Sequence, residues 1–123
     1  MRTILLIDGD QPLTRTVAYM LRMMSFAVVT ATSGQEAHQL LPATRPDVML
    51  CGDILPDMRG EQLWSALQHH SLWRDIPMII LTTNPQPASG GPGRPTYLLK
   101  PFRRMELLDS ILAALPAAPE AAA

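Results

Sequence analysis

The sequence predicts an α/β fold in which one sheet of five parallel strands is covered by helices on both faces. Short apolar runs alternate with segments of helical periodicity along the 123 residues, and this alternation is typical of βαβ units with right-handed crossovers. The length suits one domain with a substantial hydrophobic core. Hydrophobic residues make up 47% of the chain and charged residues 17%, which excludes a disordered protein.

Five short apolar runs are the expected strands. Each is bounded by polar or turn residues, as expected for strands buried on both faces of a parallel sheet. They cover residues 4–7, 26–30, 47–51, 77–81 and 97–99. The residues that follow them are Asp8-Gly9-Asp10, Gly52-Asp53, Thr82-Thr83 and Lys100. Because functional sites in such sheets lie at the carboxyl ends of the strands, we expect acids, a hydroxyl and a lysine to meet on one rim.

Four helices are expected between and after these strands. Asp10 can cap the first helix, and Pro12 suits its first turn. The second helix begins after Ser33, which has capping-box spacing to Glu36, and is expected to end at Pro42. The third and the last are predicted over residues 61–69 and 103–115. The predicted core face of the last helix comprises Met105, Leu108, Ile111, Leu112 and Leu115.

Residues 84–96 break the alternation of strands and helices. Four prolines and three glycines stand among these 13 residues, and both residue types disfavour a helix. We therefore expect a Pro/Gly-rich loop in place of a helix before the fifth strand. The predicted domain spans residues 1–115, and residues 116–123 form a Pro/Ala-rich tail or the start of a linker.

Charge and composition narrow the classes of function. The chain has 10 basic and 11 acidic residues, for a net charge of -1, so it carries no basic footprint for nucleic acid or for a membrane surface. The apolar run near the N-terminus is too short for a signal peptide or a membrane span, and a cytoplasmic location is expected. A single cysteine, Cys51, excludes an internal disulfide.

Six short motifs follow one another along the chain in a fixed order. They occupy residues 4–8, 34–37, 46–50, 55–60, 77–82 and 97–102. From about Arg2 to Leu115 the chain thereby resembles the receiver domain of bacterial response regulators, which accepts a phosphoryl group from a sensor histidine kinase. The resemblance implies a flavodoxin-like (βα)5 three-layer sandwich and a role in two-component phosphorelay signal transduction.

The resemblance also implies a set of site residues. In the family, two adjacent acids after the first strand hold Mg²⁺, and an aspartate that ends the third strand is the nucleophile. A divalent cation and an ammonium offset the charge when a carboxylate attacks a phosphate. By position, Asp8 matches the first acid, Thr82 the phosphate-binding hydroxyl, Lys100 the lysine and Tyr97 the switch aromatic. Gly9 stands where the second acid belongs.

Glycine occupies the position of the nucleophile. In the family this position lies four residues before the loop proline and eight before the loop glycine, which are Pro56 and Gly60 here. Both counts give Gly52, and so does counting six residues forward from Pro46. Asp53 comes one residue late, and a slip of one residue turns a strand side chain to the opposite face.

These departures predict a degenerate receiver, or pseudo-receiver, that works without aspartyl phosphorylation and is not an enzyme. It is expected to bind a protein partner, such as a sensor histidine kinase, or a second copy of itself, through the last helix and the fifth strand. No cofactor is expected, and neither nucleic acid nor membrane is an expected partner.

One alternative keeps the phosphoryl chemistry. Asp53 would then be the phosphoacceptor, with Mg²⁺ held by Asp8 and Asp10. Each residue also has a simpler interpretation: Asp53 as a solvated acid or a helix cap, Asp8 as the ion-pair partner of Lys100, and Asp10 as the cap of the first helix.

A second alternative is a small-ligand module. The rim around Gly9, Gly52 and Lys100 would then accept an anion in the space left by the two glycines.

Overall fold

The structure is a computed structural model that describes residues 1–84 and 94–115. Five parallel strands form one sheet in the order β2-β1-β3-β4-β5. The strands are β1 (Thr3–Ile7), β2 (Ala27–Ala31), β3 (Val48–Gly52), β4 (Met78–Thr82) and β5 (Thr96–Leu99). The helices of the described residues are α1 (Gln11–Met23), α2 (Gly34–Thr44), α3 (Gly60–Gln68) and α4 (Arg104–Ala114). The predicted flavodoxin-like sheet is confirmed.

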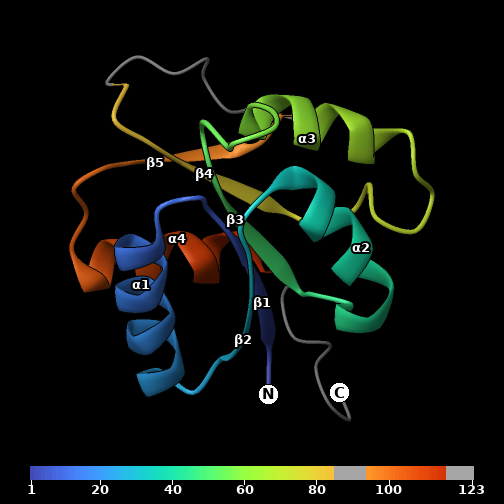
Figure 1. The fold of residues 1–123 in the computed structure, drawn as a ribbon. Helices are drawn as coiled ribbons and strands as arrows, with labels where there is room; N and C mark the ends of the chain where they lie inside the picture. The colour runs from blue at the N-terminus through green and yellow to red at the C-terminus, as the bar shows by residue number, and fades with distance from the viewer. Residues whose placement is uncertain (85–93, 116–123) are drawn as a thin grey trace, which may run out of the picture.

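The helices divide between the two faces of the sheet. Helices α1 and α4 cover one face, and α2 and α3 cover the other (Figure 1). Along β3, Leu50 packs in the core under α1 and α4, whereas Met49 and Cys51 pack under α2 and α3. Both sets are fully buried, which explains why the central strands are apolar at successive positions.

Two predicted helix caps are confirmed. The Asp10 carboxylate accepts a hydrogen bond of 3.1 Å from the Leu13 amide at the start of α1. The Ser33 hydroxyl accepts one of 3.1 Å from the Glu36 amide at the start of α2. Each bond satisfies an amide that has no partner within the helix.

The predicted end of α2 at Pro42 is wrong, because the helix continues to Thr44. A proline removes one helical hydrogen bond, but it does not prevent the next residues from keeping helical geometry. Here the Arg45 amide still bonds to the Leu41 carbonyl at 3.0 Å. Arg45 then ends the helix in the left-handed conformation, with φ of 46°.

The predicted core face of α4 is also partly wrong. Met105 and Leu112 are exposed by 59% and 55%, whereas Leu107, which is not on the predicted face, is fully buried. Ile111 is fully buried as predicted. Leu108 and Leu115 pack at the edge of the core as expected. Apolar residues occupy a broad arc of this helix, so periodicity alone did not define its buried face.

Two predictions fall on the remainder of the chain. Residues 85–93, which make up most of the expected Pro/Gly-rich loop, and the expected tail 116–123 lie outside the described residues. In the part of the chain that the structure describes, no helix is long and apolar enough to cross a membrane.

Candidate functional site

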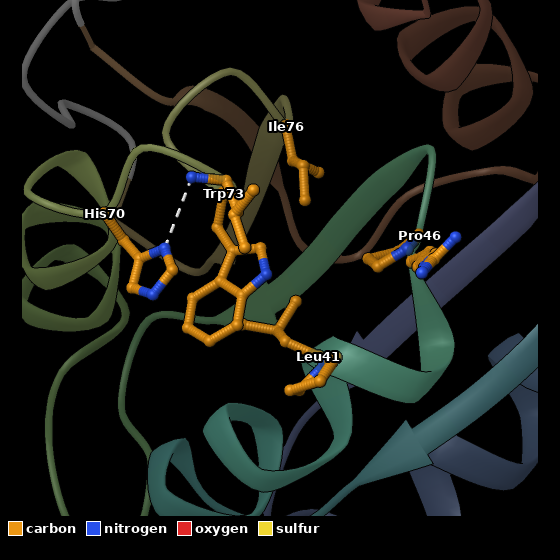
Figure 2. Close-up of a pocket in the computed structure, with 8 residues that line it drawn as sticks. Leu41, Pro46, His70, Trp73 and Ile76 are labelled. Carbon is orange, nitrogen blue, oxygen red and sulfur yellow. Dashed lines mark hydrogen bonds between the residues drawn. The ribbon is translucent and has the colours of Figure 1, made fainter.

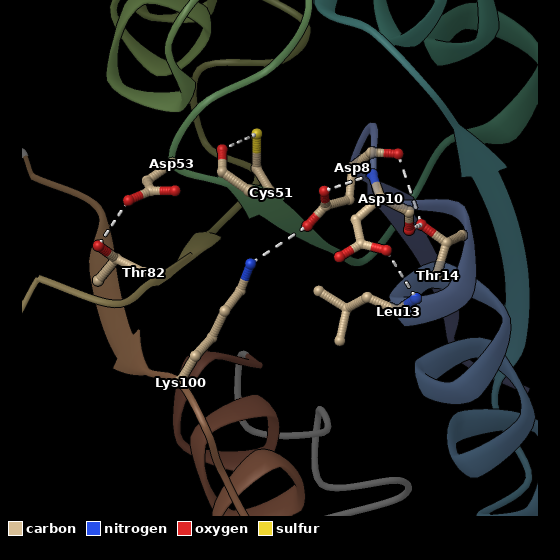
Figure 3. A network of polar contacts seen from close by, with 9 residues as sticks. Asp8, Asp10, Leu13, Thr14, Cys51, Asp53, Thr82 and Lys100 are labelled. Atoms are coloured by element: carbon tan, nitrogen blue, oxygen red, sulfur yellow. Dashed lines mark hydrogen bonds and ion pairs between the residues drawn. The ribbon is translucent and has the colours of Figure 1, made fainter.

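The carboxyl ends of the strands bring several of the predicted site residues together (Figure 3). The Lys100 ammonium, after β5, lies 3.6 Å from Asp8 Oδ2, after β1. Asp8 is only 5% exposed, and its Oδ1 accepts the Asp10 amide at 3.0 Å. The ion pair that the sequence offered as the simpler interpretation of Asp8 is therefore present. It balances a carboxylate that is nearly removed from water.

Asp8 occupies the space beside Gly52. A Cβ atom on Gly52 would lie 2.8 Å from Asp8 Oδ2 and 3.0 Å from its Cγ. Gly52 is buried at the end of β3, so such an atom has no open space to enter. A side chain at position 52 would therefore point toward the Asp8–Lys100 pair. Gly52 has no side chain and contributes no group to the pair.

Asp53 points elsewhere and binds Thr82. The Thr82 hydroxyl donates a hydrogen bond of 2.7 Å to Asp53 Oδ2, and Figure 3 shows this contact apart from the contacts of Asp8. Asp53 is half-buried and Thr82 is 3% exposed. Helix α3 begins after Arg59, so the expected role of Asp53 as a helix cap is wrong. The strand-end threonine binds a carboxylate of its own chain.

The remaining acid of the predicted metal site serves α1. The exposed side chain of Asp10 caps that helix, and no group of three or more acidic, histidine or cysteine side chains in residues 1–84 and 94–115 could hold a metal ion. Mg²⁺ requires several oxygen ligands in octahedral geometry. Gly9 and Gly52 offer no side-chain oxygen, and Asp8 is paired with Lys100. The residues present do not fit a Mg²⁺ site.

The Tyr97 side chain points toward α2 and α3, on the face of the sheet opposite to α1 and α4. It packs against the core under α2 and α3 and is half-buried. Burial, and then the Glu61 carboxylate, raise the pKa of Tyr97 above its ordinary value. The tyrosine therefore stays protonated at neutral pH and acts as a packing residue in this conformation.

Cys51 is a buried thiol beneath the rim. Its Sγ donates to the Gly52 carbonyl at 3.3 Å. Burial, and then the carboxylates of Asp8, Asp53 and Asp57, raise the pKa of the Cys51 thiol. A thiol that remains protonated is a poor nucleophile, so Cys51 acts as a small core residue.

Asp57 is a structural residue that sequence reasoning missed. Its two carboxylate oxygens accept the amides of Gly34 and Gln35, each at 2.9 Å. These bonds lower the pKa of the Asp57 carboxyl. Asp57 thus caps α2 from the β3–α3 loop. The two partners are more than twenty positions away in the chain, and no local motif signals such a contact.

A cavity of about 690 Å³ lies away from the rim, near the amino ends of β3 and β4 (Figure 2). Within it, the Trp73 ring stacks on His70 with a centroid distance of 3.8 Å. Its walls are mainly apolar. They comprise Leu41, Pro42, Arg45, Pro46, His70, Leu72, Trp73 and Ile76. None of the predicted site residues lines this cavity.

Comparison with known proteins gives a consistent result. The family described as "Response regulator receiver domain" matches residues 4–112. The phosphate regulon transcriptional regulatory protein PhoB of Pseudomonas aeruginosa is 30% identical over 118 residues, which cover 93% of this chain and 52% of PhoB. The chain therefore spans about half the length of that relative.

Two solved structures share the fold. The chemotaxis response regulator CheY4 of Vibrio cholerae superposes with a TM-score of 0.85 at 27% identity, covering 94% of this chain and 99% of that chain. The receiver domain of the sensor histidine kinase PA1611 from Pseudomonas aeruginosa PAO1 has a TM-score of 0.78 at 28% identity, covering 92% and 96%. That receiver holds a magnesium ion in its active-site cleft.

Proposed function

The chain belongs to the response regulator receiver domain family, and from this membership we propose that it is an interaction module of two-component signalling that works without aspartyl phosphorylation. The observation that carries the proposal is Gly52. Three landmarks of the sequence place the family's phosphoacceptor at this position, and glycine offers no nucleophile. The module acts in the cytoplasm, is not an enzyme and needs no cofactor.

The ion pair across the rim supports this proposal. The Lys100 ammonium, 3.6 Å from Asp8 Oδ2, offsets the charge of this carboxylate without a metal ion, while Asp8 Oδ2 has no hydrogen-bond partner in the described residues. Asp8 also fills the space into which a side chain at position 52 would extend.

The alternative in which Asp53 accepts the phosphoryl group has less support. Its carboxylate already accepts the Thr82 hydroxyl at 2.7 Å. The Mg²⁺ that this alternative needs would have to be held by Asp8 and Asp10, of which the first is paired with Lys100 and the second caps α1.

The anion-binding alternative conflicts with the charges of the rim. Three carboxylates, those of Asp8, Asp10 and Asp53, stand around one ammonium, that of Lys100. Like charges at short range repel an incoming anion, most strongly where water is partly excluded. This alternative therefore ranks behind protein binding.

An apolar surface supports the protein-binding role. Leu99 on the edge strand β5 is exposed by 49%, and Met105 and Leu112 on α4 are exposed by 59% and 55%. Met105 and Leu112 are seven residues apart, on the same side of α4, and adjoining exposed apolar side chains are typical of interaction sites. We assign this surface, the α4–β5 surface, to a protein partner such as a sensor histidine kinase or to a second copy of the chain.

The first test measures phosphorylation directly. Intact mass is recorded after incubation with acetyl phosphate and Mg²⁺ for the wild type and for Asp53→Ala, with a receiver that retains its aspartate as the positive control. We expect no mass gain in either form of this protein. A gain of one phosphoryl group that disappears in Asp53→Ala would overturn the proposal in favour of the phosphoacceptor alternative.

The second test measures self-association. Sedimentation of the wild type is compared with that of Met105→Glu over a range of concentrations. Met23→Glu serves as the matched control, because Met23 is 66% exposed on α1. If the surface pairs two copies, only Met105→Glu weakens association. A wild type that stays monomeric at every concentration would exclude a second copy as the occupant of this surface.

A further inference from the structure

Thr82, at the end of β4, takes part in three hydrogen bonds outside the regular strand pairing or at its end. Its hydroxyl donates to Asp53 Oδ2 at 2.7 Å and accepts the Asn84 amide at 3.0 Å. Its main-chain carbonyl accepts the Lys100 amide at 2.7 Å. Thr82 is only 3% exposed, so water competes poorly for these bonds. Thr82 thus joins the end of β3 to the end of β5.

Asp53 is a rigid partner for this hydroxyl. Its amide donates to the Leu81 carbonyl at 3.0 Å, and its carbonyl accepts the Gly60 amide at 2.9 Å. The backbone of Asp53 is therefore fixed from both sides. A charged acceptor in a fixed position forms a stronger and more directional bond to a hydroxyl than a neutral acceptor does.

Lys100 binds both Thr82 and Asp8. The Lys100 amide binds the Thr82 carbonyl, while its ammonium pairs with Asp8 at 3.6 Å. Residue by residue, the connection runs from Asp53 through Thr82 to Lys100 and Asp8. Lys100 directly follows Leu99, the last residue of β5, so its bonds fix the position of that strand end.

We propose that Asp53 is a positioning residue that holds Thr82, and through it Asn84 and Lys100, in one conformation. The Asp53 carboxylate thereby fixes the end of β5, which carries Leu99, without a phosphoryl group. This inference rests on the proposed function to the extent that Asp53 serves as a hydrogen-bond acceptor and not as a phosphoacceptor.

The test records amide chemical shifts and hydrogen exchange by NMR. In Asp53→Ala, the Asn84 amide should shift and the Lys100 amide, although it keeps its own bond to the Thr82 carbonyl, should exchange about threefold to tenfold faster. This factor corresponds to the net free energy of the lost Asp53–Thr82 hydrogen bond being transmitted to the end of β5. Thr82→Val, which replaces the hydroxyl by a methyl group, should move the same two amides. Asp53→Asn and Thr82→Ser retain an acceptor and a donor, and should restore most of the wild-type pattern.

Asp57→Ala is the matched control. Asp57 lies in the same loop, but its carboxylate binds the amides of Gly34 and Gln35. Its removal should change those two amides and leave Asn84 and Lys100 unchanged. If Asp57→Ala shifted Asn84 and Lys100 as well, the signals would report general loosening of the loop, and the proposal would fail.

A double-mutant comparison gives the decisive result. Adding Asp53→Ala to Thr82→Val should cause no further change at Asn84 or Lys100, because the bond between the two side chains is already absent. Additive changes, or changes confined to residues 52–54, would overturn the proposal. If Asp53→Ala does not fold, Thr82→Val and Thr82→Ser give the comparison from the other partner of the bond. The two amides should move in Thr82→Val and stay near their wild-type positions in Thr82→Ser, and equal shifts in both variants would overturn the proposal.

The phosphorylation test separates this inference from the proposed function. Mass gain on Asp53 would contradict the proposed function whatever the amides of Asn84 and Lys100 show. Absence of mass gain, together with unmoved amides in Asp53→Ala, would contradict only the positioning role.

Discussion

The Asp8 carboxylate fills the space that any side chain on Gly52 would need, since a Cβ atom there would lie 2.8 Å from Asp8 Oδ2. Asp8 is held in this place by the Lys100 ammonium and by the Asp10 amide. The missing side chain at position 52 and the paired carboxylate are therefore parts of one arrangement.

Gly52→Ala should lower the free energy of unfolding by about 1–3 kcal/mol, the usual cost of overpacking a buried site. At a position without strain the same change raises stability by about 0.4–1 kcal/mol, since alanine restricts the unfolded chain. Urea unfolding of Gly52→Ala therefore tests the crowding, because a lower free energy of unfolding supports it and a higher one contradicts it. In an Asp8→Ala background the cost should disappear, and an equal cost in both backgrounds would contradict the crowding by Asp8.

Lys100→Met should leave the Asp8 carboxylate without its cation while it remains 5% exposed. We expect a loss of about 1–3 kcal/mol in urea unfolding, the cost of a buried group left without its partner. The Lys100 side chain is 23% exposed, so water limits the loss. Asp8→Asn combined with Lys100→Met should recover most of it. If Lys100→Met lowered the free energy of unfolding equally in the wild type and in Asp8→Asn, Lys100 would stabilise the protein by packing alone.

Asp57→Asn should destabilise the protein in a pH-dependent way. The amides of Gly34 and Gln35 lower the pKa of Asp57 in the folded state relative to its unfolded value near 3.9. Its contribution is therefore complete above the unfolded pKa and is lost as the pH falls through the lower folded pKa. Unfolding free energies of wild type and variant should converge in acid. Asp109→Asn, an exposed acid on α4, controls for the loss of one carboxylate, and a pH-independent gap would contradict the assignment.

Leu107→Ala and Leu112→Ala test which face of α4 is buried. Leu107 is fully buried and Leu112 is 55% exposed. The first change should cost about 2–5 kcal/mol, as buried leucines do, and the second no more than about 0.5 kcal/mol. Thermal or urea unfolding of the two variants makes the comparison. Similar costs would mean that α4 is rotated relative to the sheet.

Local patterns were sufficient to predict the sheet and two of the helix caps. The apolar runs that became β1 and β3 are buried on both faces, and Asp10 and Ser33 precede the helices that they cap. Such features depend on residues within one turn or one strand. The buried face of α4 depends on where the helix meets the sheet, and the broad apolar arc of this helix did not encode that choice.

The sequence predicted which residues lie at the rim, but it did not predict most of the contacts between them. The sequence correctly offered the pairing of Asp8 with Lys100, because both follow strands that end at the same rim. It failed for Asp53, whose partner Thr82 lies on the neighbouring strand, and for Asp57, whose partners begin another helix. Contacts of this kind arise from the register of β3 against β4 and from the course of the loop, which are properties of the assembled fold.

The crowding at Gly52 would also oppose the replacement of this residue by aspartate during evolution. An aspartate at position 52 would enter occupied space beside a second carboxylate, and Gly9 would bring no further ligand to share a metal ion. The first substitution toward a site with an aspartate at position 52 would therefore produce a less stable protein before it produced an active one. Selection for folding alone would then preserve the glycine, whatever benefit a phosphoacceptor at this position could later confer.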